Sequence, residues 1–252
     1  MNMKSVTDTL LERRSIRRYE REPIPAETME LIYEAIRNTP TSYNGQQFSV
    51  VDVTDQPLKE KLYELTGQKQ IKTCNHFMAF CADFNKIALG ARAKGLDMPP
   101  FTDTVDGLIV GTVDAALAMM SALTVAASAG LGTCCIGYAR TVDPARMAEY
   151  LALPQGVFVV CGLALGVPRE LPDLKPKQPL SLVVHHNQYR NDTEGITADL
   201  LSYDAEVARY NATRAGARTD NDWVDHMLGY YREAMKYNLL VKLRERGYNL
   251  QS

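Results

Sequence analysis

The sequence predicts an α+β fold in which a sheet and helices form layers around a central buried helix. Short apolar segments of strand length, at residues 48–53, 77–82 and 157–165, alternate with segments of helical periodicity. Among them lie residues 108–129, a long run that is almost uncharged and rich in alanine and methionine. A helix buried nearly all round explains that composition better than a membrane span does. The pattern leaves open whether the strands run parallel or antiparallel.

The first part of the chain is predicted to hold two helices and a polar loop. Residues 1–12 form a short helix, and Pro25 opens a second one, where its missing N–H group is not needed. Pro40 ends that helix, and residues 40–46 are a loop by composition. Helical spacing places four side chains of the second helix on one buried face: Met29, Ile32, Tyr33 and Ile36.

The remaining elements follow from leucine spacing and from turn residues. Leu58, Leu62 and Leu65 mark a helix after the first strand, and Gly130 and Gly132 end the central helix. The later elements are a strand over Cys134–Tyr138, a short helix from Asp143 that ends before Pro154, a proline-rich irregular segment over 166–179 and a helical tail from Asp199 interrupted at 215–221. We therefore divide the chain into a core of residues 1–198 and a C-terminal helical extension of residues 199–252.

Composition excludes several classes of function. With 252 residues, 46% hydrophobic and 23% charged, the chain resembles an ordinary soluble globular protein. Its 28 basic and 30 acidic residues give a net charge of −2, which provides no electrostatic basis for binding nucleic acid. No uncharged apolar run reaches the ~20 residues that span a bilayer, and the N-terminus lacks the apolar stretch of a secretion signal. Five cysteines without a CxxC pair suggest buried thiols in a reducing cytoplasm.

The familiar catalytic and metal-binding motifs do not occur. Gly130-Leu131-Gly132 lacks a third glycine and precedes a strand, which reverses the order of a dinucleotide-binding fingerprint. The sequence has no phosphate-binding GxxxxGK loop, no GxSxG elbow and no HExxH or paired Cys/His spacing for zinc. His185 and His186 would point to opposite faces of a strand. We predict no metal site and no catalytic acid, base or nucleophile.

Two basic clusters remain. Arg13, Ser15 and Arg17 share one side of an extended segment, an arrangement that can bind a phosphate with bidentate hydrogen bonds. Lys175 and Lys177 flank Pro176 in the proline-rich segment, where the backbone has little freedom. Taken alone, each cluster is more often a solvated basic surface than a binding site.

The order of these motifs resembles the FMN-dependent nitroreductase family, in particular its larger, NADPH-preferring branch of oxygen-insensitive nitroreductases and flavin reductases. The N-terminal Arg13-Arg14-Ser15-Ile16-Arg17 is similar to the opening signature of that family. The other matching segments, in order, are 40–46, Leu65-Thr66-Gly67-Gln68, Cys81-Ala82-Asp83-Phe84, Gly130-Leu131-Gly132, Ile136-Gly137, Gly166-Val167-Pro168 and Asp173-Leu174-Lys175-Pro176-Lys177. The resemblance covers nearly the whole chain and implies a nitroreductase-like layered fold.

The resemblance further implies tightly bound FMN at the interface of an intertwined homodimer. On this chain, Arg13, Arg14, Ser15 and Arg17 would contact the phosphate, ribityl chain and pyrimidine edge, with Lys175 and Lys177 completing the phosphate site. Ser42, Asn44 and Gln46 would line the flavin ring from the partner subunit. The remaining residues implied are Gln68, as a hydrogen-bonding side chain, and Cys135, Ile136, Gly137 and Tyr138 beside the ring. Cys135 and Tyr138 depart from the residues usual in the branch.

The interrupted tail resembles a mobile loop whose arginine binds the 2′-phosphate of NADPH. Arg218 is the first candidate and Arg214 the second. The implied reaction is ping-pong hydride transfer from NADPH through FMN to nitroaromatic or quinone-like acceptors, with a cation such as Arg17 stabilising the reduced flavin. The alternatives are an NADPH-dependent reductase of free FMN, a flavin-binding protein without turnover and a plain anion-binding module.

Overall fold

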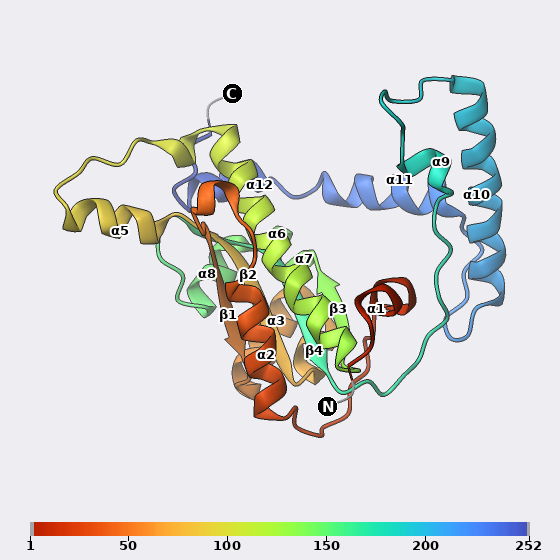
Figure 1. The fold of residues 1–252 in the computed structure, drawn as a ribbon, viewed down its shortest axis with the longest axis horizontal. Helices are drawn as coiled ribbons and strands as arrows, with labels where there is room; N and C mark the ends of the chain where they lie inside the picture. Colours follow the sequence, from red (N-terminus) through yellow and green to blue (C-terminus); the bar gives the residue numbers. More distant parts are fainter. Residues whose placement is uncertain (1–2, 251–252) are drawn as a thin grey trace. The chain divides into compact units, whose positions relative to one another are not determined.

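The computed structural model describes residues 3–250, and in that range the strands form one four-stranded antiparallel sheet of order β1-β2-β4-β3 (Figure 1). Its strands are β1 (Phe48–Val53), β2 (His76–Asp83), β3 (Gly132–Ile136) and β4 (Val157–Gly166). The predicted strands are confirmed, except that β3 stops before Gly137. Gly137 adopts helical backbone angles, and Tyr138 begins a short helix instead of continuing the strand.

The chain divides into two units, and each is described by itself. The first contains the sheet; it runs to Leu171 and resumes at Asn238. The second is Pro172–Tyr237. The division into a core of 1–198 and an extension of 199–252 stays a prediction.

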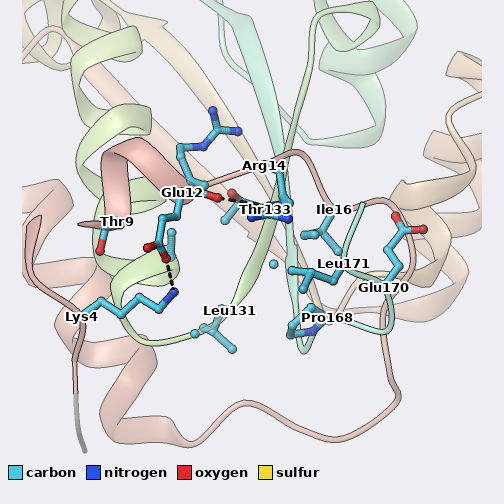
Figure 2. Close-up of a pocket in the computed structure, with 14 residues that line it drawn as sticks. Lys4, Thr9, Glu12, Arg14, Ile16, Leu131, Thr133, Pro168, Glu170 and Leu171 are labelled. Carbon is cyan, nitrogen blue, oxygen red and sulfur yellow. Dashed lines mark hydrogen bonds and ion pairs between the residues drawn. The ribbon is translucent and has the colours of Figure 1, made fainter. Parts of the chain in front are cut away.

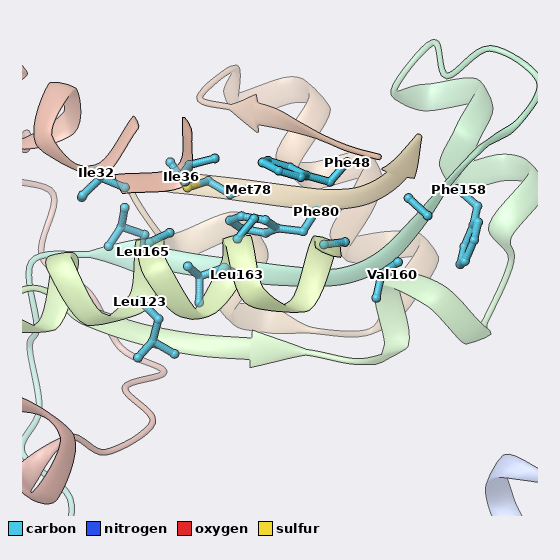
Figure 3. Packing of buried hydrophobic residues seen from close by; sticks show 14 of the residues in the cluster. Ile32, Ile36, Phe48, Met78, Phe80, Leu123, Phe158, Val160, Leu163 and Leu165 are labelled. Carbon is cyan, nitrogen blue, oxygen red and sulfur yellow. The ribbon is translucent and has the colours of Figure 1, made fainter. Parts of the chain in front are cut away.

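Helices cover both faces of the sheet in the first unit. On one face lie α2 (Ala26–Arg37) and α6 (Val105–Ser128). Figure 3 shows Ile32 of α2, Phe80 of β2 and Leu163 of β4 in the resulting core. The other face carries α3 (Gln56–Thr66), α4 (Lys69–Thr73), α7 (Tyr138–Thr141) and α8 (Pro144–Tyr150). The remaining elements of this unit are α1 (Val6–Glu12), η1 (Ser42–Asn44), α5 (Asn85–Ala93), η2 (Phe101–Asp103) and α12 (Leu239–Arg244).

Helix α2 has the predicted buried face with one exception. Met29, Ile32 and Ile36 are buried, but the side chain of Tyr33 is 42% exposed. Its hydroxyl donates to the carboxylate of Asp52 at 2.6 Å, and this hydrogen bond to the edge strand β1 keeps the ring at the surface. Pro25 is the residue before the first helical turn and not the first helical residue itself.

Helix α6 is long and apolar as predicted, but within one chain it is buried on one side only. Small residues face the sheet, and a Cβ atom at Gly111 would lie 2.8 Å from that of Ala82, so the helix approaches β2 closely. By length and composition α6 could cross a membrane, but the core helices of soluble proteins have the same length and composition. Of the most apolar 18-residue stretch of α6, 33% is buried. The opposite side exposes an apolar stripe, defined by Ile109, Val113, Leu117 and Met120. The predicted all-round burial is therefore not met inside a single chain.

The end of the described chain packs into the core of the first unit. Tyr248 is fully buried, stacks edge-on against Phe158 at 5.0 Å between ring centroids, and donates its hydroxyl to the carbonyl of Gly156 at 3.2 Å. Arg246 donates to the carbonyl oxygens of Leu153 and Val157. These contacts fix the segment after α12 against the start of β4.

The hydroxyl of Tyr248 gives a test of this packing. We expect Tyr248→Phe to lower the free energy of unfolding by about 1 kcal/mol, because the Gly156 carbonyl loses one of its two donors and keeps only the Phe84 N–H, while the ring stays in place. Urea denaturation measures the change, with Tyr189→Phe, whose ring is 75% exposed, as the matched control. Equal stability of the two variants would contradict this role.

The second unit is helical, as predicted for the tail. It contains α9 (Leu180–Val183), α10 (Thr193–Thr213) and α11 (Trp223–Ala234). Helix α10 begins at Thr193, six residues before the predicted start, and the carboxylate of Asp192 caps it. The predicted interruption is confirmed, since residues 215–221 contain no helix.

Candidate functional site

The N-terminal arginine segment is fixed along the edge of the sheet. After α1 the backbone becomes extended at Arg13, and Ser15 pairs in parallel with Thr133 of β3. Ile16 fills the space beside Gly132, where an added Cβ would lie 2.8 Å from its side chain. The buried hydroxyl of Tyr19 donates to the Ile16 carbonyl at 2.6 Å. These contacts bury Ile16 and Tyr19 and leave the arginines on the other side of the segment.

Arg13 is the arginine most directly prepared for a ligand. Its Nε atom is buried and has no hydrogen-bond partner among residues 3–250. Arg13, Arg14 and Thr133 line a pocket of about 140 Å³, which also holds the ion pair of Lys4 with Glu12 (Figure 2). A buried guanidinium nitrogen without an acceptor is costly, and an oxygen of a ligand would satisfy it. The site therefore fits an anionic group such as a phosphate.

Arg17 belongs to a second, larger pocket of about 710 Å³. Its backbone N–H donates to Glu170 at 2.7 Å, and the side chain of Arg18 forms a 3.7 Å ion pair with the same glutamate. Gln68 adjoins this pocket, and its side-chain oxygen accepts from Gln70 at 2.9 Å. The lining residues are Arg17, Arg18, Tyr19, Gly67, Lys69, Gln70, Thr73 and Arg169.

Of the residues that line this pocket, only Arg17 was a predicted site residue; the basic and amide side chains that were not predicted are Arg18, Lys69, Gln70 and Arg169. Lys69 lies in the short helix α4 and Arg169 in an irregular segment, where a basic residue is usually solvated. Gly67 is the one residue here whose type indicates a turn. It ends α3 in the left-handed conformation, with a φ of 68°, which glycine adopts easily. Periodicity and composition carry no signal that this turn meets Arg17; only the family resemblance, which assigns both Gln68 and Arg17 to the flavin, implied it.

The end of β3 lies next to the arginine segment. Cys135 is exposed, Ile136 is buried and Tyr138 is half-buried. At Gly137 an added Cβ would meet only the Arg140 guanidinium, 4.0 Å away, so the backbone is open to a ligand. Although the residue reaches the surface, desolvation of its sulfur by the surrounding protein raises the pKa of the Cys135 thiol to about 11, while the charge of Arg13 opposes this rise. The structure thus brings Arg13, Ser15 and the end of β3 together.

The pKa of Cys135 predicts low reactivity despite its exposure. With a pKa of about 11 instead of 9, the thiolate fraction at pH 7.5 is about one hundredth of that of an ordinary thiol. We expect alkylation by iodoacetamide to be slow at pH 7.5 and about tenfold faster for each pH unit up to 11. Mass spectrometry of the Cys135 peptide measures the rate, with Cys135→Ser as the blank. Rapid alkylation at pH 7.5 would contradict the expectation.

The loop with Ser42, Asn44 and Gln46 lies elsewhere on the first unit. The N–H of Ser42 donates to Asp114 in the middle of α6, whereas the N–H of Lys4, which lines the same pocket as Arg13, donates to the carbonyl of Ser128 at the end of α6. Fourteen residues of helix separate these anchors, which corresponds to about 21 Å. The structure does not bring this loop next to the arginine segment within one chain.

Lys175, Lys177 and Arg218 lie in the second unit and are exposed. Lys175 and Arg214 line a pocket of about 220 Å³. The carboxylate of Asp173 accepts from the N–H of Ala215 at 2.9 Å, which connects the lysine segment with the 214–221 loop. Arg218 does not line this pocket. The other lining residues are mostly aromatic or amide-bearing: Pro176, Tyr203, Val207, Tyr210, Asn211, Thr219, Asn221, Trp223 and His226.

Comparison with known proteins matches both units. The pattern of the nitroreductase family fits residues 10–167, and that of its C-terminal domain fits residues 175–251. An FMN reductase [NAD(P)H] of Bacillus subtilis is 33% identical over 250 residues, covering 99% of this chain and 100% of the relative. An oxygen-insensitive NADPH nitroreductase of Salmonella typhimurium is 37% identical, covering 89% and 90%. The solved structure of Bacillus megaterium NfrA2 superposes with a TM-score of 0.92 at 32% identity, covering 99% and 100%. The chain belongs to the nitroreductase family.

Proposed function

We propose that this protein is an enzyme that uses NADPH to reduce nitroaromatic compounds, quinones or similar acceptors through bound FMN, in a ping-pong reaction. Two relatives that match along almost all of their length are named as an FMN reductase and an NADPH nitroreductase, so FMN and NAD(P)H are its cofactor and reductant. The observation in the structure that carries the proposal is Arg13, whose buried Nε lacks an acceptor beside the open end of β3. When bound, FMN supplies the electron transfer that no side chain can perform.

Binding and orientation are the tasks of the residues themselves. Arg13, Ser15 and Arg17 would hold the phosphate and the polar edge of FMN from the N-terminal segment. Several convergent cations suit a group that carries up to two negative charges. A guanidinium group such as that of Arg17 would place fixed positive charge near the polar edge of the ring, where reduction adds electron density. The further contacts in this proposal are Arg14, Gln68, Cys135, Ile136, Gly137, Tyr138, Lys175 and Lys177.

In this proposal, an arginine of the second unit gives the enzyme its preference for NADPH over NADH. We keep Arg218 as the first candidate for the 2′-phosphate, with Arg214 as the second. Support for Arg214 comes from its place in a pocket with Lys175 and several aromatic rings, which suits a planar ligand carrying negative charge.

A homodimer is part of the proposal. The apolar stripe of α6 is exposed in the single chain, and contiguous apolar surface of this kind marks protein–protein contacts. A second copy would cover the stripe and bring its own Ser42, Asn44 and Gln46 toward the arginine segment, from which they are remote within one chain. The five cysteines are all free, which agrees with a cytoplasmic protein.

The visible spectrum tests the function directly. Purified protein reconstituted with FMN should show a flavin spectrum that NADPH bleaches without air and that a quinone or nitrofurazone restores. A protein that binds FMN but is not bleached would be a flavin-binding protein without turnover. A protein that takes up no FMN would refute the proposal.

One relative favours a second function, because its name is FMN reductase. Under that alternative, free FMN would be the main acceptor. Steady-state rates with added FMN, nitrofurazone and a quinone at equal concentrations would separate the two. A kcat/KM for free FMN well above both other values would identify a flavin reductase.

A further inference from the structure

Asp114 is a charged residue in the middle of the apolar helix α6, and its side chain is completely buried. Both carboxylate oxygens accept hydrogen bonds from the backbone of one loop. Oδ1 accepts from the N–H of Ser42 at 3.1 Å, and Oδ2 accepts from that of Gln47 at 3.2 Å. Within residues 3–250, no basic side chain forms an ion pair with Asp114. The carboxylate is stabilised by the backbone N–H groups at the two ends of the loop.

The loop between these anchors has an unusual backbone. Tyr43, Asn44 and Gln46 have φ values of 53°, 54° and 52°, a left-handed conformation that non-glycine residues rarely adopt. Gly45, the residue that would adopt it most easily, has a φ of −72°. An added Cβ at Gly45 would collide with the side chain of Gln47. The loop therefore persists only because its surroundings hold it.

From outside the loop, Asp114 accepts hydrogen bonds at both of its ends, and the N–H of Asp83 donates to the carbonyl of Gln47 at 3.0 Å. Inside the loop, the hydroxyl of Thr41 accepts from Gln46 N–H at 3.1 Å, and the Gln46 side chain donates to Asn44. These local bonds move with the loop, whereas Asp114 belongs to a helix packed on the sheet. Tyr43 at the tip is fully exposed, so it gains no support from packing.

We propose that Asp114 is a positioning residue for the reaction: it holds residues 41–47 in the conformation that presents Asn44 and Gln46 to the flavin. The inference rests on the proposed function, because it assigns this loop to the flavin site of the partner subunit. A carboxylate suits the task better than an amide, since it accepts at both oxygens and offers no donor that would face a backbone N–H.

Asp114→Asn is the matched test, because it keeps the shape and replaces one acceptor oxygen by an NH2 group. We expect the amide hydrogens of Ser42 and Gln47 to exchange at least about tenfold faster, because one hydrogen bond to a charged acceptor is lost. The dissociation constant of FMN should rise about tenfold, and the visible spectrum of the bound flavin should shift. Ser121→Ala is the control, since it removes the hydrogen bond of Thr39 to the same helix and leaves the loop untouched.

Each outcome decides the inference. Faster exchange with weaker FMN binding in Asp114→Asn, but not in Ser121→Ala, supports it. Unchanged exchange and an unchanged flavin spectrum overturn it. If Asp114→Asn does not fold, hydrogen exchange of the wild-type protein still tests the inference. The amide hydrogens of Ser42 and Gln47 should then exchange slowly. Exchange at these two amides as fast as at the amide of Tyr43 overturns the inference. If the wild type binds no FMN, the proposed function fails, while the exchange measurement still decides whether Asp114 holds the loop.

Discussion

Replacing both Val113 and Leu117 by glutamate is expected to convert the proposed dimer into monomers that bind no FMN. Both side chains belong to the exposed apolar stripe of α6. Burying a carboxylate in an apolar interface costs several kcal/mol, so four of them in a symmetric dimer should raise its dissociation constant more than about 100-fold. Because the 41–47 loop is anchored on α6 about 21 Å from Ser128, the end of the helix beside the pocket of Arg13, a monomer would offer only part of the flavin site.

Light scattering after size-exclusion chromatography measures the mass, and flavin absorbance measures bound FMN. Ile87→Glu is the matched control, since it places the same charge on an exposed apolar position of α5. A folded monomer with wild-type affinity for FMN would show that each chain forms a complete site. A variant that stays dimeric would show that another surface joins the subunits.

Arg13→Ala is expected to weaken FMN binding about 30-fold. Losing a hydrogen bond to a charged partner costs about 2 kcal/mol, and every 1.4 kcal/mol is a factor of ten. Arg13→Lys should recover only part of this loss, because an ammonium group lacks the planar, bidentate geometry of a guanidinium group. Removing Arg13 should also raise the pKa of the Cys135 thiol further, because the charge of Arg13 lowers it in the wild type.

Fluorescence titration of apoprotein with FMN measures the affinity. Arg146→Ala, which removes an exposed arginine of α8 paired with Glu149, is the matched control. Equal affinities of Arg13→Ala and Arg146→Ala for FMN would show that Arg13 does not bind the cofactor. In that case the unpartnered Nε would need another explanation, such as a bound water.

The main elements of the fold were predictable because their signals are local. Apolar runs of strand length and the spacing of Met29, Ile32 and Ile36 depend only on neighbours along the chain. Helices α4 and α5 were not predicted, since neither carries a continuous apolar face; α5 has no buried residue at all. Tyr33 fits the helical pattern but lies at the surface, because its hydroxyl finds an acceptor on another element.

For the site, the sequence by itself determined the chemistry: a group of arginines beside a serine, a later pair of lysines and the absence of any catalytic motif. Only the tertiary structure decided which of these residues meet. It placed Arg13 beside Cys135, brought Lys69 and Arg169 to Arg17, and anchored the 41–47 loop on Asp114. These contacts join residues far apart in the chain, and the sequence carries no local signal for them. Burial also depends on how the chain packs. Because α6 is apolar on all sides, its sequence could not indicate that the apolar stripe would be exposed in a single chain.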